Sequence, residues 1–258
     1  KVRDKEFLKL CENCTVVIIS SYDALKDLRR FFPKAVSKSF VLQFAVSPHK
    51  ENENLVTFDE LKLRYSFSSP YYLLPNQFWA HKNHKVVIEA LGILKKKNVS
   101  VTVLATGNTN DYRQPGHFYN LEKLICAEDI ANEFKVLGII PYTDLLALFQ
   151  YASAIINPSF FEGWSTVVEE AKAVRKNVIL SDIAIHREQS PEFGTYFNPS
   201  DAEELASILS ENTTSNNLML ESDIQVAADN FTNYGLTYQI LVKRVVKSNK
   251  VGINKHTT

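Results

Sequence analysis

Two glutamates, Glu162 and Glu170, stand on either side of a predicted helix start, with seven residues between them. Thr166 and Glu169 have the spacing of a capping box, which predicts a helix from Thr166 to Val174. Unpaired amides at such a helix start attract phosphate, whereas two carboxylates repel it. The combination is expected if one carboxylate binds a ribose and the other a hexose, with a diphosphate between them. The spacing alone equally fits a solvated loop residue at 162 and a helix-surface residue at 170.

No set of residues has the spacing of a metal or redox site. Cys11 and Cys14 form a CxxC motif, but neither a second such pair nor a pair of histidines completes a zinc site. A predicted strand follows the motif, whereas a thioredoxin-like site needs a helix there. His81, His84 and His186 are not spaced as metal ligands, and His84 is expected to have a capping or packing role. We therefore expect neither a metal nor a cofactor.

Short β-branched runs alternate with segments of helical period, which is typical of an α/β fold with a parallel, doubly wound, Rossmann-like sheet. The predicted strands are residues 15–20, 39–46, 71–75, 99–107, 134–138, 153–158 and 177–181. The predicted helices are residues 22–32, 57–65, 84–97, 121–131, 142–151, 166–174, 202–209 and 222–247. Ligands of such sheets bind beyond the carboxyl ends of the strands, which is where the loop with Glu162 lies.

The pattern divides the chain into four parts. Residues 70–221 have the length and the alternation of one complete domain. Residues 1–48 are too few to bury a core alone, so they are either an extension packed on that domain or, as we predict, the remnant of a first Rossmann-like domain. Residues 49–69 are expected to be a linker, and residues 222–258 a long amphipathic helix and a tail.

Composition restricts the classes of partner. Lys and Arg together number 29, as do Asp and Glu, so nothing in the overall charge draws the chain to nucleic acid or anionic lipid. The longest apolar runs are far too short to cross a bilayer. Three cysteines do not make a secreted disulfide framework, which favours a reducing cytoplasm. No GxGxxG follows a predicted strand, which argues against a nicotinamide-dependent oxidoreductase.

Residues 157–174 resemble the signature of glycosyltransferase family 4, a group of GT-B-fold enzymes, in which Glu, seven residues and Glu include a Glu-Gly-aromatic loop. Residues 14–33, 74–84, 137–159 and 178–189 resemble other segments of that family. These segments occur in the expected order and cover nearly the whole chain. The resemblance implies the GT-B fold, with residues 70–221 as its C-terminal, donor-binding domain.

The resemblance also implies roles for particular residues. Glu162 would contact hydroxyls of the donor sugar near the reacting centre, Glu170 the ribose, and Lys82 the diphosphate leaving group. The turn at Ile139 and Ile140 would contact the base. Backbone amides of the signature loop would bind sugar and phosphate, namely those of Gly163, Trp164, Ser165 and Thr166. No metal ligand is implied.

The chain departs from the family at two positions. Gln77 stands where the family usually has an arginine, five positions before Lys82, so a charged clamp on the donor is replaced by a neutral side chain. Ser165 stands where the family usually has a second glycine, which narrows the sugar pocket slightly. Both departures bear on the identity of the donor and its affinity more than on the class of reaction.

The family implies transfer of a hexose from a nucleoside-diphosphate sugar to a glycan or lipid-linked acceptor, with retention of configuration. The acceptor, and any peripheral association with the inner face of a membrane, would belong to the first domain. The chain alone is therefore expected to bind donor without turnover. The alternative is a catalytically inactive module that binds a nucleotide or nucleotide sugar. Gln77 favours this alternative slightly, and retention of both Glu162 and Glu170 favours the enzyme.

Overall fold

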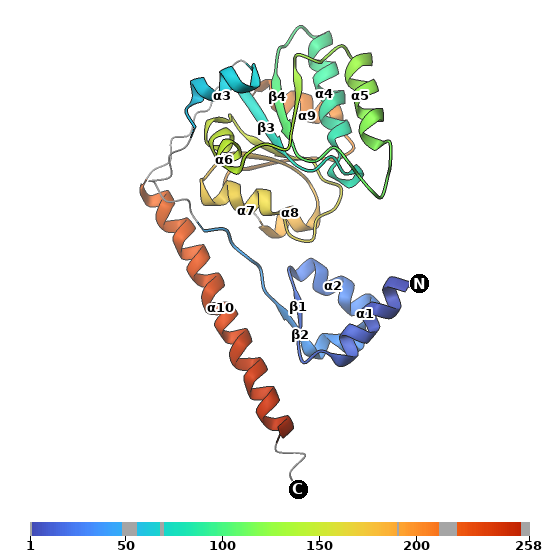
Figure 1. Cartoon of the computed structure of the whole chain (residues 1–258), viewed down its shortest axis with the longest axis vertical. Coiled ribbons are helices and arrows are strands. Elements are labelled where there is room, and N and C mark those ends of the chain that lie inside the picture. The colour runs from blue at the N-terminus through green and yellow to red at the C-terminus, as the bar shows by residue number, and fades with distance from the viewer. Residues whose placement is uncertain (1, 48–55, 68–69, 190, 212–220, 254–258) are drawn as a thin grey trace. The chain divides into compact units, whose positions relative to one another are not determined.

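The computed structural model describes residues 2–47, 56–67, 70–189, 191–211 and 221–253. The chain forms two compact units (Figure 1). The first unit joins Lys1–Ser47 with Gln225–Thr258, and the second unit is Pro48–Ile224. Residues 49–55 and 68–69 of the predicted linker lie outside the described residues, and residues 56–67 contain a helix.

The first unit is built on two short parallel strands. Its elements are α1 (Val2–Asn13), β1 (Val17–Ile19), α2 (Tyr22–Phe31), the 3-10 helix η1 (Pro33–Lys38), β2 (Ser39–Val41) and most of α10 (Glu221–Ile253). β1 pairs with β2 over a small core formed by Cys11, Ile19, Leu28 and Ala35. The Arg244 guanidinium of α10 donates hydrogen bonds to the carbonyls of Ser37 and Ser39, at 3.1 and 3.2 Å. The 33-residue helix therefore packs beside η1 and the start of β2 within this unit.

Two features of the first unit differ from the sequence prediction. The strand predicted over residues 39–46 ends at Val41, because β1 offers only three residues to pair with. Helix α1 was not predicted, since nearly all its described side chains are exposed and it has no apolar stripe. Among the described residues, no helix is long and apolar enough to cross a membrane, α10 included.

The second unit is a parallel six-stranded sheet of order β5-β4-β3-β6-β7-β8, and this confirms the predicted doubly wound α/β fold (Figure 1). Its elements are α3 (Phe58–Tyr65), β3 (Tyr71–Pro75), the 3-10 helix η2 (Ala80–Lys82), α4 (His84–Lys96), β4 (Thr102–Thr106), α5 (His117–Ala127), β5 (Phe134–Gly138), α6 (Tyr142–Tyr151), β6 (Ile155–Asn157), α7 (Thr166–Ala173), β7 (Val178–Ser181), α8 (Ala184–Gln189), β8 (Gly194–Phe197) and α9 (Ala202–Glu211). The order reverses at β3, which pairs with β4 on one side and β6 on the other.

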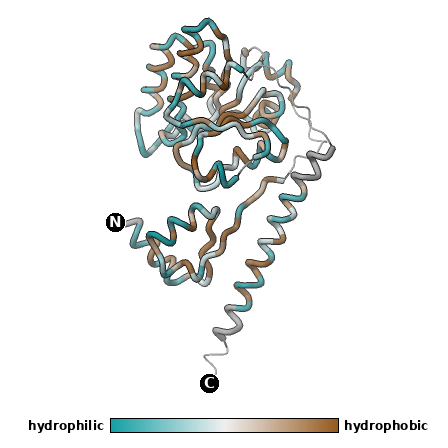
Figure 2. Tube along the Cα trace, turned by 180° about the vertical axis from the view of Figure 1, so that it is seen from behind, coloured by the Kyte–Doolittle hydropathy of each residue, from teal (hydrophilic) through white to brown (hydrophobic). Residues whose placement is uncertain are grey.

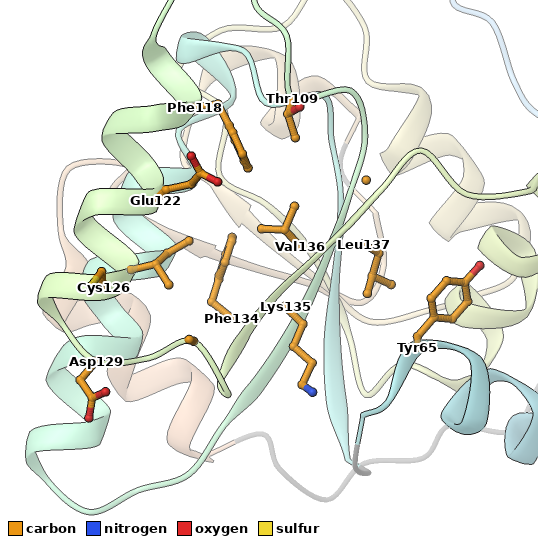
Figure 3. A pocket seen from close by; sticks show the side chains of 13 residues that line it. Tyr65, Thr109, Phe118, Glu122, Cys126, Asp129, Phe134, Lys135, Val136 and Leu137 are labelled. Atoms are coloured by element: carbon orange, nitrogen blue, oxygen red, sulfur yellow. The ribbon is translucent and has the colours of Figure 1, made fainter.

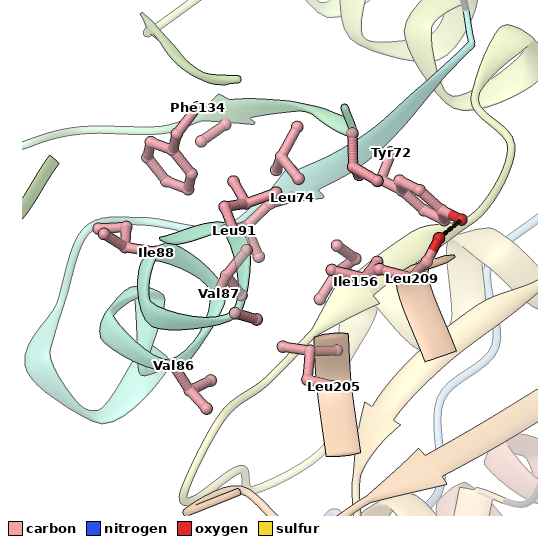
Figure 4. Close-up of a cluster of buried hydrophobic side chains, with 14 of the residues drawn as sticks. Tyr72, Leu74, Val86, Val87, Ile88, Leu91, Phe134, Ile156, Leu205 and Leu209 are labelled. Atoms are coloured by element: carbon pink, nitrogen blue, oxygen red, sulfur yellow. Dashed lines mark hydrogen bonds between the residues drawn. The ribbon is translucent and has the colours of Figure 1, made fainter. Parts of the chain in front are cut away.

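Alternating side chains of the strands build a separate core on each face of the sheet. Tyr72 and Leu74 of β3 face α4, α5 and α9, where the Tyr72 hydroxyl donates to the Leu209 carbonyl at 2.9 Å (Figure 4). Tyr71 and Leu73 face α3, α6 and α7. Figure 2 shows the hydrophobic residues concentrated along these strands. Both faces are covered, as a parallel sheet requires.

The second unit contains three departures from the predicted elements. Helix α5 starts at His117 and ends at Ala127, not over 121–131, because Gly116, with a left-handed φ of 86°, is the residue before its first turn. Neither α8 nor β8 was predicted. Strand β8 is a four-residue edge strand in which only Phe197 is fully buried, so it lacks the apolar run of a buried strand.

The loops after β3, β4 and β5 are joined at the carboxyl edge of the sheet. Gly107 has a φ of +133°, and a Cβ there would lie 2.5 Å from the Asn76 carbonyl oxygen, so only glycine fits. The Gly107 amide donates to the Gly138 carbonyl at 2.8 Å, and the Phe78 amide to the Asn108 carbonyl at 3.0 Å. These bonds fix the edge at which the predicted site lies.

Candidate functional site

Lys82 and Glu162, eighty positions apart, meet at the carboxyl edge of the sheet. The Lys82 ammonium lies 2.6 Å from Glu162 Oε1, and the two side chains are only 13% and 9% exposed. Lys82 comes from η2 after β3, and Glu162 from the loop after β6, so the pair spans the point where the strand order reverses. This switch point is where open α/β sheets hold their ligands.

Asn83 holds the turn that presents Lys82. It has a left-handed φ of 55°, which ends η2 and lets α4 begin at His84. Its amide donates to the carbonyls of Pro158 and Pro199, at 3.0 and 2.8 Å, and thereby ties this turn to the loop after β6. His84 is fully buried with its ring stacked on Phe78, 4.2 Å between centroids, which agrees with the expected packing role.

A chain of hydrogen bonds between buried polar side chains leads to Glu162. Ser159 Oγ lies 2.7 Å from Glu162 Oε1 and 2.8 Å from Asn157 Oδ1, and its single proton serves one of them at a time. The Asn157 amide group donates to Ser165 Oγ at 2.8 Å, and the Asn76 amide group donates to Asn157 Oδ1 at 3.2 Å. This chain connects the ends of β3 and β6 to the start of α7.

The residue that caps α7 is Ser165, not Thr166. Ser165 Oγ accepts a hydrogen bond from the Val168 amide, and Thr166 is the first helical residue. The predicted capping box is therefore wrong, although the predicted helix start holds. Glu169 fails to reach the cap because it is buried, where it accepts hydrogen bonds from the Gln189 amide group and the Lys172 ammonium.

Gln189, in α8, forms two hydrogen bonds with the backbone of the capping residue Ser165. Its Oε1 accepts a hydrogen bond from the Ser165 amide at 3.2 Å, and its Nε2 donates to the Ser165 carbonyl at 2.9 Å. Nε2 also lies 2.9 Å from Glu169 Oε1. The Ser165 amide, predicted to bind ligand, is thus occupied within the protein. Gly163 and Thr166 are exposed in the same loop, and Trp164 is half-buried.

Glu170 lies apart from the Lys82–Glu162 pair. It is half-buried and lines a small gap with Tyr142 and Phe149 of α6, and burial raises the pKa of its carboxyl group. Tyr142 begins α6, directly after the turn at Ile139 and Ile140, and Ile139 is 77% exposed. The structure thus brings Glu170 toward the turn predicted to contact a base, and Glu162 toward Lys82.

Three other polar side chains complete this edge. Gln77 is exposed, and its Oε1 accepts a hydrogen bond from the Asn108 amide at 2.7 Å. His186 is buried, with Nδ1 2.9 Å from the Ser181 carbonyl oxygen, while the Ser181 hydroxyl donates to the Ser159 carbonyl. Burial lowers the pKa of His186, so its ring is neutral near pH 7. Within the described residues, no three His, Cys, Asp or Glu side chains gather as metal ligands would.

The sequence did not reveal the residues that hold the pair in place. Asn157 and Ser159 flank a proline directly after a predicted strand, and that position was the available signal. For Gln189 there was none, because its role depends on the placement of the unpredicted helix α8.

A separate hollow of about 870 Å³ lies along the edge strand β5, between α5 and the end of α3 (Figure 3). Its lining includes Glu122, Cys126, Lys135 and Val136, but none of the predicted site residues. It runs along the outer edge of the sheet, whereas the Lys82–Glu162 pair lies at the strand ends. We place the functional site at the pair because the charged groups converge there.

The chain is similar to known proteins in sequence. The family model described as "Glycosyl transferases group 1" matches residues 66–221. The O-antigen chain mannosyltransferase RfbU of Salmonella typhimurium is 26% identical over 134 residues, which are 51% of this chain and 35% of that protein. A glycosyltransferase of Methanocaldococcus jannaschii is 22% identical over 183 residues, 69% of this chain and 45% of that protein. The chain thus spans less than half the length of these curated relatives.

Solved structures share the fold. A glycosyltransferase from Rickettsia africae has a TM-score of 0.71 at 19% identity, covering 97% of this chain and 68% of that chain. Alr3699/HepE of Anabaena, solved in complex with UDP and glucose, has a TM-score of 0.67 at 15% identity. The match covers 99% of this chain and 67% of that chain. The α/β architecture of this chain matches that of these GT-B proteins.

Proposed function

The chain belongs to the glycosyl transferases group 1 family, and on that premise we propose that it is the donor-binding part of a retaining hexosyltransferase of glycosyltransferase family 4. A hexose would pass from a nucleoside-diphosphate sugar to a glycan or lipid-linked acceptor, with its anomeric configuration retained. The observation that carries the proposal is the Lys82–Glu162 pair, 2.6 Å apart at the switch point of the sheet and close to the start of α7.

Names of similar proteins support this assignment. One relative is an O-antigen chain mannosyltransferase, and one structural neighbour was solved with UDP and glucose. They support a nucleotide-sugar donor and a role in assembling a glycan. The spacing of Glu162 and Glu170, within a Glu-Gly-aromatic loop, supports family 4 and retention.

Each side chain of the edge has a place in this proposal. Lys82 contacts the diphosphate, Glu162 accepts hydrogen bonds from the sugar, and Glu170 accepts them from the ribose beside the base-binding turn at Ile139 and Ile140. Donor binding gives Lys82 and Glu162 new partners, because phosphate oxygens approach the ammonium and hydroxyls approach the carboxylate. As the bond between the sugar and the phosphate breaks, negative charge grows on the diphosphate, and the preplaced ammonium stabilises it.

The start of α7 supplies further positive potential. Its dipole and the backbone amides of Gly163, Trp164 and Thr166 favour an anion at this end of the helix. We assign Ser165 to capping the helix rather than to an amide contact, since Gln189 occupies its amide. With Lys82, these groups allow the diphosphate to bind and leave without a metal ion. Acceptor recognition, and any peripheral contact with a membrane, we assign to the first unit and further parts of the protein.

A second candidate is a nucleotide-binding module without catalysis. Gln77 favours it, because a neutral side chain whose oxygen accepts the Asn108 amide adds no charge to the donor site. Turnover by the full-length protein separates the two functions, since only the enzyme consumes a nucleotide sugar when an acceptor is present.

Calorimetry with UDP, GDP and ADP in the presence of a chelator tests the donor site. We expect the chain to bind at least one of these diphosphates, and Lys82→Gln to weaken that binding far more than binding of the matching nucleoside. A folded chain that bound none of the three, or bound them only with a divalent ion, would contradict the proposed phosphate site. An equal loss for nucleoside and diphosphate would place Lys82 elsewhere.

A further inference from the structure

The loop between β4 and α5 is bonded to the turn that carries Lys82. Asp111, only 5% exposed, accepts hydrogen bonds from the Ala80 amide at 3.1 Å and from the Arg113 amide at 2.9 Å. The Lys82 amide in turn donates to the Trp79 carbonyl at 2.8 Å. One set of hydrogen bonds therefore fixes the backbones of the Arg113 loop and of the Lys82 turn.

The side chain of Arg113 lies against this turn. Its guanidinium carbon lies 4.7 Å from the centre of the Trp79 ring, whose neighbour is the His81 ring at 5.7 Å. Nε lies 3.7 Å from Asp111 Oδ1, and the Arg113 side chain is 47% exposed. Among the described residues, its terminal nitrogens make no hydrogen bond. This contact leaves the donors of the guanidinium open to an anion.

The side chains around this turn supply little positive charge to a bound anion. Gln77 is neutral, and its side-chain oxygen is bonded to the Asn108 amide. The Lys82 ammonium is paired with Glu162, which offsets its charge until a ligand binds. Burial, and then the charge of Lys82, lower the pKa of His81, so this ring is neutral near pH 7. A further cation at this edge strengthens the binding of a diphosphate beyond what Lys82 and the start of α7 provide.

We propose that Arg113 is a second cationic contact for the diphosphate of the donor and acts together with Lys82. The inference rests on the proposed function, because it requires a nucleoside diphosphate at this edge of the sheet. The planar fork of a guanidinium matches two oxygens of a phosphate, which a lysine cannot do. Trp79 contacts the guanidinium, and Asp111 sets the position of the loop.

Calorimetry on the full chain tests the proposal, with UDP, GDP, ADP and the matching nucleosides as probes at low and high salt. Arg113→Gln is expected to weaken the tightest-binding diphosphate roughly 5- to 30-fold, the range for one partly exposed charge-assisted contact. Nucleoside binding should not change, and the difference should shrink at high salt. Arg113→Lys should retain part of the affinity, because it keeps the charge and loses the fork.

Lys97→Gln is the matched control. It removes the same charge from an exposed side chain at the far end of α4, roughly 20 Å from the Lys82 turn at 1.5 Å per residue, and should bind as the wild type does. Diphosphate binding that Lys82→Gln weakens and Arg113→Gln leaves unchanged would overturn the role of Arg113 and leave the proposed function standing. Equal losses of diphosphate and nucleoside in Arg113→Gln would also overturn it. If the folded wild-type chain bound none of the diphosphates, both proposals would fail.

Discussion

Lys82 and Glu162 compensate each other in the unliganded protein. Because both side chains are largely buried, loss of either leaves an uncompensated charge, which is more costly than loss of an exposed ion pair. Ser159 adds a hydroxyl contact to the carboxylate. At the scale of single residues, the proposed site is therefore an ion pair. A ligand can replace this ion pair by contacting the ammonium and the carboxylate separately.

The two glutamates should respond differently to the same change. Glu170→Gln is expected to weaken nucleoside diphosphate binding about tenfold, the scale of one lost charged hydrogen bond, because we propose that Glu170 accepts hydrogen bonds from the ribose. Glu162→Gln should leave that binding intact or strengthen it, because it releases the charge of Lys82. In the full-length protein Glu162→Gln should lower turnover roughly 100-fold. Calorimetry and steady-state kinetics measure the two effects.

Glu203→Gln, an exposed change at the start of α9, serves as the control for net charge. Circular dichroism must first show that every variant is folded. Loss of nucleotide binding in Glu162→Gln together with wild-type binding in Glu170→Gln would reverse the assignment. If an active full-length protein tolerated both changes, the spacing of the two glutamates would be a coincidence.

At the scale of elements, α8 holds the start of α7 through one side chain. The Gln189 amide group contacts both backbone groups of Ser165 and the carboxylate of Glu169, and all three residues are buried. The loop before α7 carries Glu162. The geometry of this loop therefore depends on α8, which comes after α7 and β7 in the chain. Gln189 is a positioning residue, since it touches the loop and not the ligand.

Gln189→Glu should damage this contact in a pH-dependent way. A carboxylate accepts from the Ser165 amide but cannot donate to the Ser165 carbonyl, and it would repel the Glu169 carboxylate about 2.9 Å away. We expect a loss of about 2–4 kcal/mol at pH 8, typical of a broken buried network. Repulsion raises the pKa of the introduced carboxyl, so the loss relative to wild type should shrink at pH 5 as that group gains a proton.

Urea unfolding of wild type and variant at both pH values measures this effect. Gln189→Leu is the matched control, because it removes the same hydrogen bonds without adding a charge, and its loss should be nearly independent of pH. A Gln189→Glu loss that did not depend on pH, or that grew toward pH 5, would show that repulsion from Glu169 is not the cause.

Elements with strong apolar runs could be predicted from the sequence, and weakly patterned ones could not. β3, β5 and α6 match their predicted bounds residue for residue, because each of them is rich in apolar residues. α1 was missed because its side chains are largely exposed, and β8 because its four residues form no apolar run. The resemblance assigned Lys82 and Glu162 to one donor site, but their ion pair was not predicted, since nothing local joins two residues eighty positions apart. The Ser165–Gln189 contact exists only once the helices are packed.

At the scale of the whole molecule, the two units have separate cores of very different size. The first unit buries a single small cluster around Cys11, Ile19, Leu28 and Ala35. The second unit buries a large cluster on each face of its sheet. Burial of apolar area is the main favourable term in folding, so the first unit should be the less stable one.

Unfolding of each unit can be followed by its own probe. Both tryptophans, Trp79 and Trp164, lie in the second unit, so tryptophan fluorescence follows that unit alone. Cys11 is 8% exposed in the core of the first unit, and with Cys14→Ser and Cys126→Ser it is the sole thiol. We expect pulse labelling of Cys11 to reach its midpoint at lower urea than the fluorescence change. A nucleoside diphosphate at 100 times its Kd should stabilise the second unit by about 2.7 kcal/mol, shifting the fluorescence midpoint upward while the Cys11 midpoint stays. Coincident midpoints that move together with ligand would instead show that the two cores unfold as one cooperative unit.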